Sequence, residues 1–455
     1  MAAANVIDPS SVQLLEVLHV RNFARLALTI APALFAGCGG SQVPIGAPGA
    51  MAQGSAIAPA RTGVHRMTTY SYRVVYRFPY ARDGGRPEGS LIDVNGKLYG
   101  TTQFGGGGAC GIFGGTGCGT VYRLDPTSGR KKQLYGFHGG SADGAYPNGG
   151  LIDVNGTLYG TTTYGGGGCG NYGCGTVFNV STTGTETMLH SFDHQSDGQW
   201  PFASLIDVNG TLYGATELGG QGSCDCGTVY SISTSGSEKI LYTFGAKPDA
   251  QYPVAGLLDV KGTLYGTTSA GGSSEDGTVY SVTTTGTEKV LHSFGGSPDG
   301  AMPSSGLIDV RGTLYGTTPA GGDALCYEVE NTCGIVYSIT ATGKEEVLYT
   351  FTPGNDFGGG AHPLAGLVNV KGVLYGTASV GGNGYGCNEN GCGVAYSVTT
   401  TGNETVLHVF NGGSDGAGPD SAVIDVNGTL YGTTPNGGGS NCQRFGCGTV
   451  FALTP

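Results

Sequence analysis

The sequence predicts an all-β fold, a seven-bladed β-propeller whose blades are four-stranded antiparallel sheets. Two observations predict the repeat. A segment close to LIDVNGTLYGTT occurs seven times, beginning at Leu91, Leu151, Leu205, Leu257, Leu307, Leu367 and Val423. Successive copies start 60, 54, 52, 50, 60 and 56 residues apart, which is room for four short strands joined by turns. A third observation, the matching of the two chain ends, predicts that the ring closes.

Each copy reads as four strands in order. In the fourth copy GLLDV, TLYGTT, GTVYSVT and EKVLHSF are runs rich in β-formers, and KG and TTG are tight turns. We expect strands of five to seven residues, with long loops after the second and fourth strands. Alternate connections of a meandering sheet lie on the same side. All long loops should therefore share one face of the ring, where binding residues usually lie.

The ends of the chain are complementary. The last copy stops at GTVFALTP without a fourth strand, and YRVVYRF at residues 72–78 matches EKVLHSF. We expect this N-terminal strand to complete the last blade, because closure removes long exposed edges. Three aromatic positions recur in the copies and should fill the space between blades: the Tyr of LYG, the ring of VY or VF, and the Phe that ends EKVLHSF.

The repeat resembles a known family. LIDVNGTLYGTT, a Gly pair, GCGTVYSVTTTG and EKVLHSF resemble the GloVer tandem repeat of bacterial secreted and surface-anchored proteins, over residues 70–455. A weaker similarity links them to kelch blades, which also place a Gly pair after the second strand. The resemblance implies a propeller-like extracellular module with varied anchors, and it implies no established activity.

Residues 1–37 predict export with a lipoprotein-type signal peptide. Arg21 and Arg25 precede the short apolar run LALTIAPALFAG, and LFAGC resembles the lipobox in which the Cys, here Cys38, is acylated. Ordinary cleavage after AMA, residues 50–52, is the alternative. A location at the outer membrane or cell surface follows from lipidation, and secretion follows from ordinary cleavage.

The rest of the chain predicts a tether and one domain. Residues 38–69 are small and rich in Pro and Gly, as in a flexible tether, and residues 70–455 form the propeller. The formal net charge of -12 argues against nucleic acid as a partner. We expect a monomer that contacts a membrane through the N-terminal lipid only.

Twelve further cysteines form six local pairs in the loops after the second strand. An even number in an exported chain indicates disulfides, whereas zinc needs four suitably spaced ligands. The fourth copy has no pair, and Asp276 stands where its second Cys would be. The expected pairs are Cys110/Cys118, Cys169/Cys174, Cys224/Cys226, Cys326/Cys333, Cys387/Cys392 and Cys442/Cys447.

Repeated acidic residues and histidines are predicted to be structural. An Asp or Asn before each VNG, VKG or VRG should cap a type I turn in which only Gly has positive φ. A second Asp opens the fourth-to-first loop, and one carboxylate per blade is too few for calcium. His190, His292 and His408 stand where other copies have Tyr, which indicates packing. We expect no metal, no cofactor and no catalytic constellation.

One variable position suggests a ligand site. The residue before the Pro of the fourth-to-first loop favours large rings, and it is Arg86, Tyr146, Trp200, Tyr252, Met302, His362 or Gly418. Such a ring of side chains suits stacking on a sugar or anchoring a protein, with packing between blades as the alternative. The leading hypothesis is a binding module for a glycan or protein. The alternatives are a propeller hydrolase or lyase acting on extracellular polysaccharide, and then a structural or stalk role.

Overall fold

The computed structural model describes residues 70–79, 81–110, 117–222, 224–323, 333–352, 359–382, 387, 391–439 and 446–454. Contacts divide the chain into two units, Met1–Thr62 and Gly63–Pro455, and the described residues all belong to the second. Cys38, the predicted signal peptide and the whole of the predicted tether therefore lie outside the described residues. None of the helices found among the described residues has the length and apolar character needed to span a bilayer.

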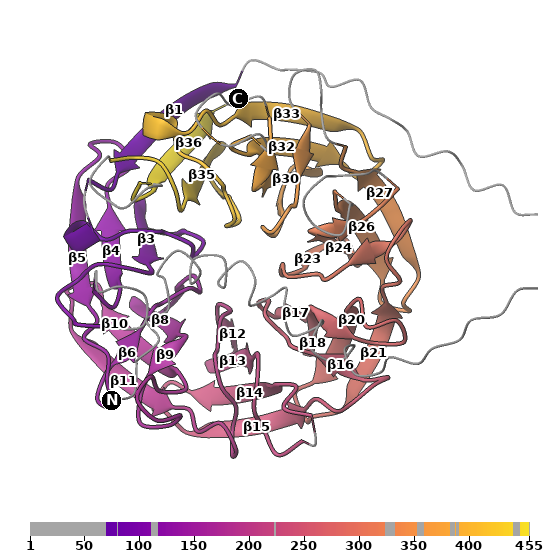
Figure 1. Ribbon diagram of the computed structural model, residues 1–455, viewed down its shortest axis with the longest axis horizontal. Helices are drawn as coiled ribbons and strands as arrows, with labels where there is room; N and C mark the ends of the chain where they lie inside the picture. Colours follow the sequence, from indigo (N-terminus) through magenta and orange to yellow (C-terminus); the bar gives the residue numbers. More distant parts are fainter. Residues whose placement is uncertain are drawn as a thin grey trace, which may run out of the picture. The chain divides into compact units, whose positions relative to one another are not determined.

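The described unit is a closed ring of seven four-stranded antiparallel sheets, as predicted (Figure 1). Blade 1 contains β2 (Ile92–Val94), β3 (Lys97–Thr102), β4 (Thr120–Leu124) and β5 (Lys131–Gly136). Blade 2 contains β7 (Ile152–Val154), β8 (Thr157–Thr162), β10 (Thr176–Ser181) and β11 (Glu186–Ser191). Blade 3 contains β12 (Ile206–Val208), β13 (Thr211–Thr216), β14 (Thr228–Ser233) and β15 (Glu238–Thr243). Blade 4 contains β17 (Leu258–Val260), β18 (Thr263–Thr268), β20 (Thr278–Thr283) and β21 (Glu288–Ser293).

The remaining blades follow the same order from the centre of the ring to its outside. Blade 5 contains β23 (Ile308–Val310), β24 (Thr313–Thr318), β26 (Ile335–Thr340) and β27 (Glu345–Thr350). Blade 6 contains β29 (Val368–Val370), β30 (Val373–Ala378), β32 (Val394–Thr399) and β33 (Glu404–Val409). Blade 7 contains β34 (Ile424–Val426), β35 (Thr429–Thr434), β36 (Thr449–Thr454) and, from the start of the propeller, β1 (Ser71–Arg77).

The predicted closure of the ring is confirmed. Strand β1 pairs antiparallel with β36, with Ser71 opposite Thr454 and Arg77 opposite Thr449. Figure 1 shows β1, at the indigo start of the colour scale, beside the yellow β36. The N-terminal strand thus covers what would otherwise be an exposed strand edge.

The first strand of each blade is shorter than expected, at three residues instead of five to seven. These strands lie nearest the centre of the ring, where the blades converge (Figure 1). Just before them, the chain bonds to a neighbouring blade instead of extending its own ladder. Thr101 Oγ1 donates to the Gly149 carbonyl at 3.1 Å, and Thr161 Oγ1 donates to the Ala203 carbonyl at 2.9 Å.

The turns between the first two strands also differ from the prediction of a type I turn. Both turn residues have positive φ, for example 54° at Asn95 and 75° at Gly96, or 56° at Lys261 and 84° at Gly262. This pattern is the two-residue type I′ hairpin, whose twist matches that of the flanking strands. The gain from a turn that matches the strand twist outweighs the cost of about 1–2 kcal/mol for placing a Lys in the left-handed region.

The core between blades repeats one aromatic contact at all seven interfaces. The Phe after the fourth strand meets the ring of VY or VF in the next blade edge to face, with centroids 5.0–5.4 Å apart. Both rings are fully buried, as the sequence predicts. The Gly of LYG makes room for this ring, because a Cβ at Gly266 would lie 2.5 Å from Tyr280 Oη.

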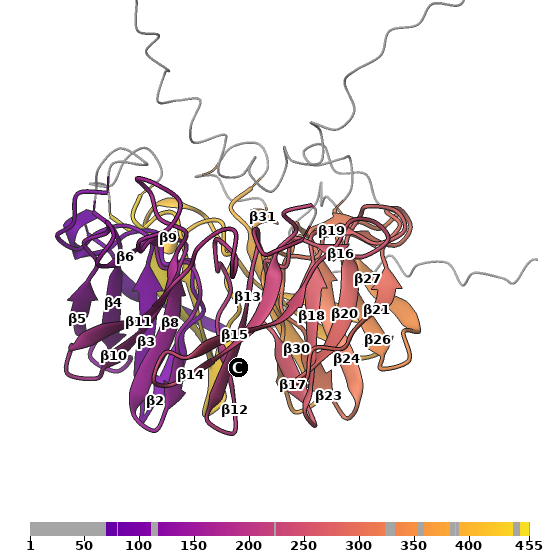
Figure 2. The same ribbon diagram turned by 90° about the horizontal axis from the view of Figure 1, so that it is seen from below.

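The two faces of the ring differ. Figure 2 shows the two-residue turns at the lower face and the long loops at the upper face. Four small two-stranded sheets tie the long loops together there. They are β6 (Gly144–Ala145) with β9 (Tyr164–Gly165), β16 (Ala250–Gln251) with β19 (Ala270–Gly271), β22 (Gly300–Ala301) with β25 (Ala320–Gly321), and β28 (Gly360–Ala361) with β31 (Val380–Gly381).

Candidate functional site: the long-loop face

The variable position before the loop Pro has a left-handed backbone in every blade. Its φ lies between 53° and 63° in all seven copies: Arg86, Tyr146, Trp200, Tyr252, Met302, His362 and Gly418. Glycine is the residue that adopts this conformation without strain, and only blade 7 uses it. The other six blades place a large side chain there, at a cost of about 1–2 kcal/mol each.

Backbone hydrogen bonds hold this position between two blades. The Tyr146 amide donates to the Cys118 carbonyl of blade 1 at 2.7 Å, and the Tyr146 carbonyl accepts from the Thr163 amide of blade 2 at 3.1 Å. The Met302 amide makes the same bond to the Asp276 carbonyl at 2.7 Å. Asp276 therefore takes the place of a second Cys, as predicted. Because the backbone alone makes these bonds, the side chain is free to vary.

The side chains at this position differ in exposure. Tyr146 is 1% exposed and His362 is 6% exposed, so these two rings are buried between blades. Arg86, Trp200, Tyr252 and Met302 are partly exposed. Tyr146 and His362 therefore pack between blades, whereas the other side chains remain accessible from the long-loop face.

A continuous row of rings crosses blades 1 to 3, and we call it the aromatic belt. Its members are Phe104, Tyr146, Tyr164 and Trp200, whose neighbouring ring centroids are 5.8, 5.7 and 5.8 Å apart in that order. The Arg86 guanidinium lies over the Phe104 ring at 5.8 Å and extends the row. Sequence reasoning found Tyr146 and Trp200 but missed Phe104 and Tyr164, which follow the second strand at a position that varies between copies.

Disulfides brace the loops that follow the second strand of the blades. The predicted pairs Cys110–Cys118, Cys169–Cys174, Cys224–Cys226 and Cys387–Cys392 are formed. Cys333 and Cys447 are also disulfide-bonded, and their predicted partners Cys326 and Cys442 lie outside the described residues.

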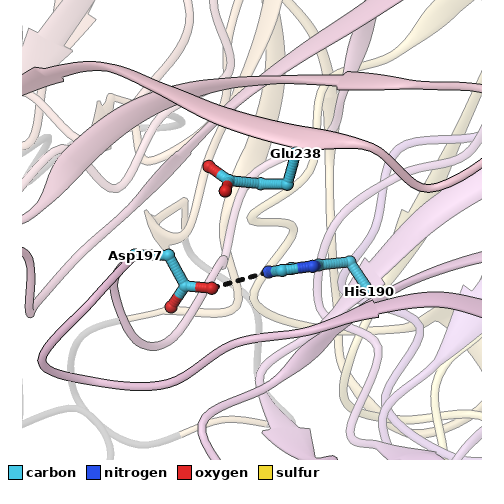
Figure 3. A group of neighbouring side chains, drawn as sticks. All are labelled: His190, Asp197 and Glu238. Carbon is cyan, nitrogen blue, oxygen red and sulfur yellow. Dashed lines mark hydrogen bonds and ion pairs between the residues drawn. The ribbon is translucent and has the colours of Figure 1, made fainter.

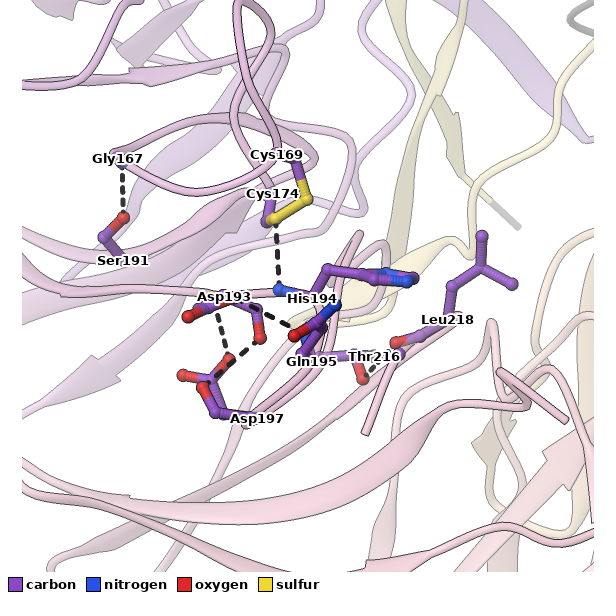
Figure 4. The surroundings of a disulfide bond; sticks show 12 residues. Gly167, Cys169, Cys174, Ser191, Asp193, His194, Gln195, Asp197, Thr216 and Leu218 are labelled. Carbon is purple, nitrogen blue, oxygen red and sulfur yellow. Dashed lines mark hydrogen bonds between the residues drawn. A yellow bond between two sulfur atoms is a disulfide. The ribbon is translucent and has the colours of Figure 1, made fainter. Parts of the chain in front are cut away.

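The Cys169–Cys174 loop shows how this bracing presents a ring. Figure 4 shows the Cys174 sulfur, which accepts a hydrogen bond from the His194 amide of the next long loop at 3.3 Å. The loop contains Tyr172, whose side chain is 57% exposed, and the Tyr172 carbonyl accepts from the Gly165 amide at 2.8 Å. A disulfide, a neighbouring loop and the backbone next to Tyr164 of the aromatic belt therefore hold the loop that carries this exposed ring.

An acidic group near the start of blade 1 was not found by sequence reasoning. Arg86 pairs with Glu88 at 2.7 Å. Burial and the charge of Glu88 raise the pKa of the Asp420 carboxyl well above its usual value, while Arg86 acts in the opposite direction. Both acids follow the loop Pro, where other copies have Asn148, Phe202, Val254, Ser304 or Leu364. Comparison of this second variable position would have revealed the group.

The acidic residues before the inner turns have the structural role that was predicted. Asp207 Oδ1 accepts from the Gly210 amide at 2.9 Å, and Asn369 Oδ1 accepts from the Gly372 amide at the same distance. The bond spans three residues instead of the expected two, since the turn is type I′. These side chains stabilise hairpins on the face opposite the long loops.

In six blades an aspartate of the second set joins the long loop to the outer strand before it, and Asp356 of blade 5 lies outside the described residues. Asp143 accepts from Tyr135 Oη, the His138 amide and the Gly144 amide at 2.9, 2.7 and 2.7 Å. In blade 2, His190 Nε2 lies 2.7 Å from Asp197 Oδ2. Tyr and His alternate in the copies because either ring tip can donate this hydrogen bond, which agrees with the predicted packing role.

A third side chain, from the next blade, completes what we call a rim cluster. It is the residue that begins the outer strand of that blade, such as Glu186 beside Tyr135 and Asp143, or Glu238 beside His190 and Asp197. Among the described residues, two rim clusters present three groups that can bind a metal: His190, Asp197 and Glu238, and His292, Asp299 and Glu345. The sequence did not reveal this contact, because the Glu lies on another blade.

Comparisons with protein families and with solved structures give several similarities. Residues 61–225 and 220–451 match the Gloeobacter/Verrucomicrobia repeat, and no curated protein matches the chain. Similar solved structures include a Niastella koreensis GH74 enzyme, with 15% identity over 80% of this chain and 52% of that one and a TM-score of 0.48. An oligogalacturonate lyase from Vibrio parahaemolyticus has 10% identity over 85% and 97%, with a TM-score of 0.47. A Xanthomonas campestris gluconolactonase has 12% identity over 88% and 99%, with a TM-score of 0.40.

Proposed function

The chain belongs to the Gloeobacter/Verrucomicrobia repeat family, and on that premise we propose that it is an exported, lipid-anchored binding module. Its long-loop face holds a glycan or protein ligand, and the accessible part of the aromatic belt is the centre of that face. The chain performs no chemistry on the ligand in this proposal. Its disulfides support a place outside the cytoplasm, since such bonds persist in oxidising compartments.

The observation that carries the proposal is the left-handed backbone at the variable position. Six blades accept the strain of a large residue there, although glycine would remove it, as Gly418 does in blade 7. Backbone strain that recurs at one site indicates a functional or packing demand on the side chain. Packing between blades explains the large side chains of Tyr146 and His362, which are buried. It does not account for the partly exposed Trp200, Tyr252 and Arg86.

The surroundings of these side chains favour recognition. Backbone hydrogen bonds to two blades fix Trp200, Tyr252 and Arg86, and disulfides brace the loops beside Trp200 and Tyr252. Such rings lose little conformational freedom when a ligand binds, which improves affinity. Trp, Tyr and Arg are also the side chains that most often dominate binding energy at interfaces.

A second candidate function is the hydrolysis or cleavage of extracellular polysaccharide. One observation favours it: the raised pKa of Asp420 beside Glu88. A carboxyl group whose pKa is raised by its surroundings can act as a general acid beside a second carboxyl group that acts as base or nucleophile. Binding remains the leading proposal, because the rings of the belt are more numerous than these acids and span three blades.

The experiment is a binding screen of the full chain against a glycan array and a panel of extracellular proteins. Saturable binding of one glycan or protein class, with the ligand recovered unchanged, supports the module. Release of new reducing ends or unsaturated sugars, abolished by Asp420→Asn, supports the enzyme instead. If neither binding nor turnover is saturable, the long-loop face is not a ligand site and the structural role takes its place.

A further inference from the structure

We propose that two rim clusters, His190/Asp197/Glu238 and His292/Asp299/Glu345, are binding sites for a divalent transition-metal ion such as zinc. In each site the His and Asp come from one blade and the Glu comes from the next. The ion would therefore join blade 2 to blade 3 at one site, and blade 4 to blade 5 at the other. Figure 3 shows His190, Asp197 and Glu238 with their polar ends turned toward one another.

The geometry of both clusters is close to a coordination sphere. One ligand atom from each residue lies within 4.8 Å of the other two. His190 Nε2 is 2.7 Å from Asp197 Oδ2, and His292 Nε2 is 3.1 Å from Asp299 Oδ2. Ligand atoms around tetrahedral zinc are about 3.3 Å apart, given zinc–ligand distances of about 2.0–2.2 Å. Small side-chain rotations would thus admit the ion in place of the proton between His and Asp.

Backbone donors already orient the carboxylates. Asp197 Oδ1 accepts from the Asp193 amide at 2.6 Å, and Asp299 Oδ1 accepts from the Gly300 amide at 2.7 Å. Their Oδ2 atoms face the imidazoles, and Asp299 Oδ2 also accepts from the Gly295 amide at 3.2 Å. Outer hydrogen bonds of this kind fix the direction of a metal ligand and are a regular part of metal sites.

The Glu of each cluster has a buried carboxylate oxygen without a hydrogen-bond partner in the described part of the chain. Glu238 Oε1 and Glu345 Oε1 are enclosed, and neither atom has a hydrogen-bond partner among the described residues. Two carboxylates beside one imidazole leave an excess of negative charge that a divalent cation would neutralise.

The ligand types select the metal. An imidazole nitrogen with two carboxylate oxygens suits zinc, cobalt or nickel, whereas calcium and magnesium prefer oxygen ligands alone. Three protein ligands leave one position of a tetrahedral ion for water. The inferred role is to hold neighbouring blades together, since each site spans an interface.

Other rim clusters show what happens where one ligand is replaced. Between blades 6 and 7, Tyr72 stands where Glu would be, stacks on His408 with centroids 3.6 Å apart, and donates to the Asp415 carbonyl. Between blades 7 and 1, Lys131 takes the Glu position and pairs with Asp83 at 2.9 Å. In that cluster the Lys131 ammonium supplies a positive charge, which shows that the loop Asp can pair with a cation at this interface.

The test counts metal ions bound to the full chain and to matched His→Tyr variants. Zinc is titrated in equilibrium dialysis, and cobalt is followed by its visible absorption. His190→Tyr and His292→Tyr convert each cluster into the form that Tyr135 and Tyr242 already give the neighbouring blades, so the fold should remain. His408→Tyr is the control, because its cluster lacks the Glu.

Each of His190→Tyr and His292→Tyr should remove one equivalent of zinc, the double variant should remove both, and His408→Tyr should remove none. Zinc should also raise the melting temperature of the unchanged chain more than that of the double variant. The proposal is overturned if the double variant binds as much zinc as the unchanged chain. It is equally overturned if the unchanged chain shows no saturable zinc binding and no cobalt absorption.

Discussion

The phenol of Tyr135 donates a 2.9 Å hydrogen bond to Oδ2 of Asp143, and this bond ties the outer strand of blade 1 to the loop that leads to blade 2. The same carboxylate accepts from the backbone amides of His138 and Gly144. Asp143 is 7% exposed, so water cannot readily replace these bonds. Equivalent pairs recur in blades 2, 3, 4, 6 and 7, which makes the bond a repeated device for holding the long-loop face.

Asp143→Ala should destabilise the propeller by about 2 kcal/mol or more, because it leaves three donors without an acceptor in a buried place. Asp207→Ala is the control, since the exposed Asp207 accepts one bond at 2.9 Å and should cost about 1 kcal/mol or less. Guanidinium unfolding of both variants gives the comparison. Equal losses in the two variants would show that the long-loop aspartates have no special structural role.

Removal of residues 70–79 should lower the melting temperature of the whole ring. The deletion removes β1, exposes the edge of β36, and takes away the buried Phe78 that contacts Tyr122. Ser71 lies opposite Thr454, so the same segment can be attached after Thr454 by a short hairpin. That permuted chain should recover most of the lost stability. A deletion variant that melts like the unchanged chain would refute closure by β1.

The content of the blades could be predicted because it depends on residues within one repeat, and closure could be predicted because the first segment of the propeller supplies the strand that the last repeat lacks. YRVVYRF matched EKVLHSF, and the recurrent Phe and Tyr rings pack as expected. The predicted turn type was wrong. The intrinsic preference of Lys disfavours positive φ at Lys261, but the twist of the paired strands requires it there.

The rim clusters could not be predicted, since Glu238 meets His190 only when the outer strands of two blades come together. At the variable position, the sequence showed which residues vary but not that Tyr146 is buried. Its exposure depends on rings contributed by blade 2, including Tyr164.

Stability should fall as pH rises from about 5 to 8. Burial is the main cause that raises the pKa of Glu186 and of Glu288 to about 7, compared with 4.5 in the unfolded chain. The folded state therefore binds more protons in this window, so its stabilisation is complete below about pH 4.5 and is lost as the pH passes 7. Melting temperatures measured in a chelator at several pH values give the slope. In the Glu186→Gln/Glu288→Gln variant the slope should be flatter, and an unchanged slope would contradict this assignment.

Cys38→Ser should move the protein from the membrane fraction to the periplasm or medium. Stable anchoring in this account depends on acyl chains attached to Cys38. The measurement is fractionation together with incorporation of labelled palmitate. A variant that still sediments with membranes, together with an unlabelled parent protein, would refute the lipid anchor and favour ordinary cleavage after Ala52.

The most direct test of the binding face is the affinity of Trp200→Gly for the ligand found in the screen, measured beside Met302→Gly. Both changes occur at the same position of different blades and relieve the same backbone strain, since φ is 60° at Trp200 and 54° at Met302. Only Trp200 belongs to the aromatic belt. We expect at least about a tenfold loss of affinity in Trp200→Gly, near-parental affinity in Met302→Gly, and similar melting temperatures. Parental affinity in Trp200→Gly, or equal losses in both variants, would contradict the claim that the aromatic belt is the ligand site.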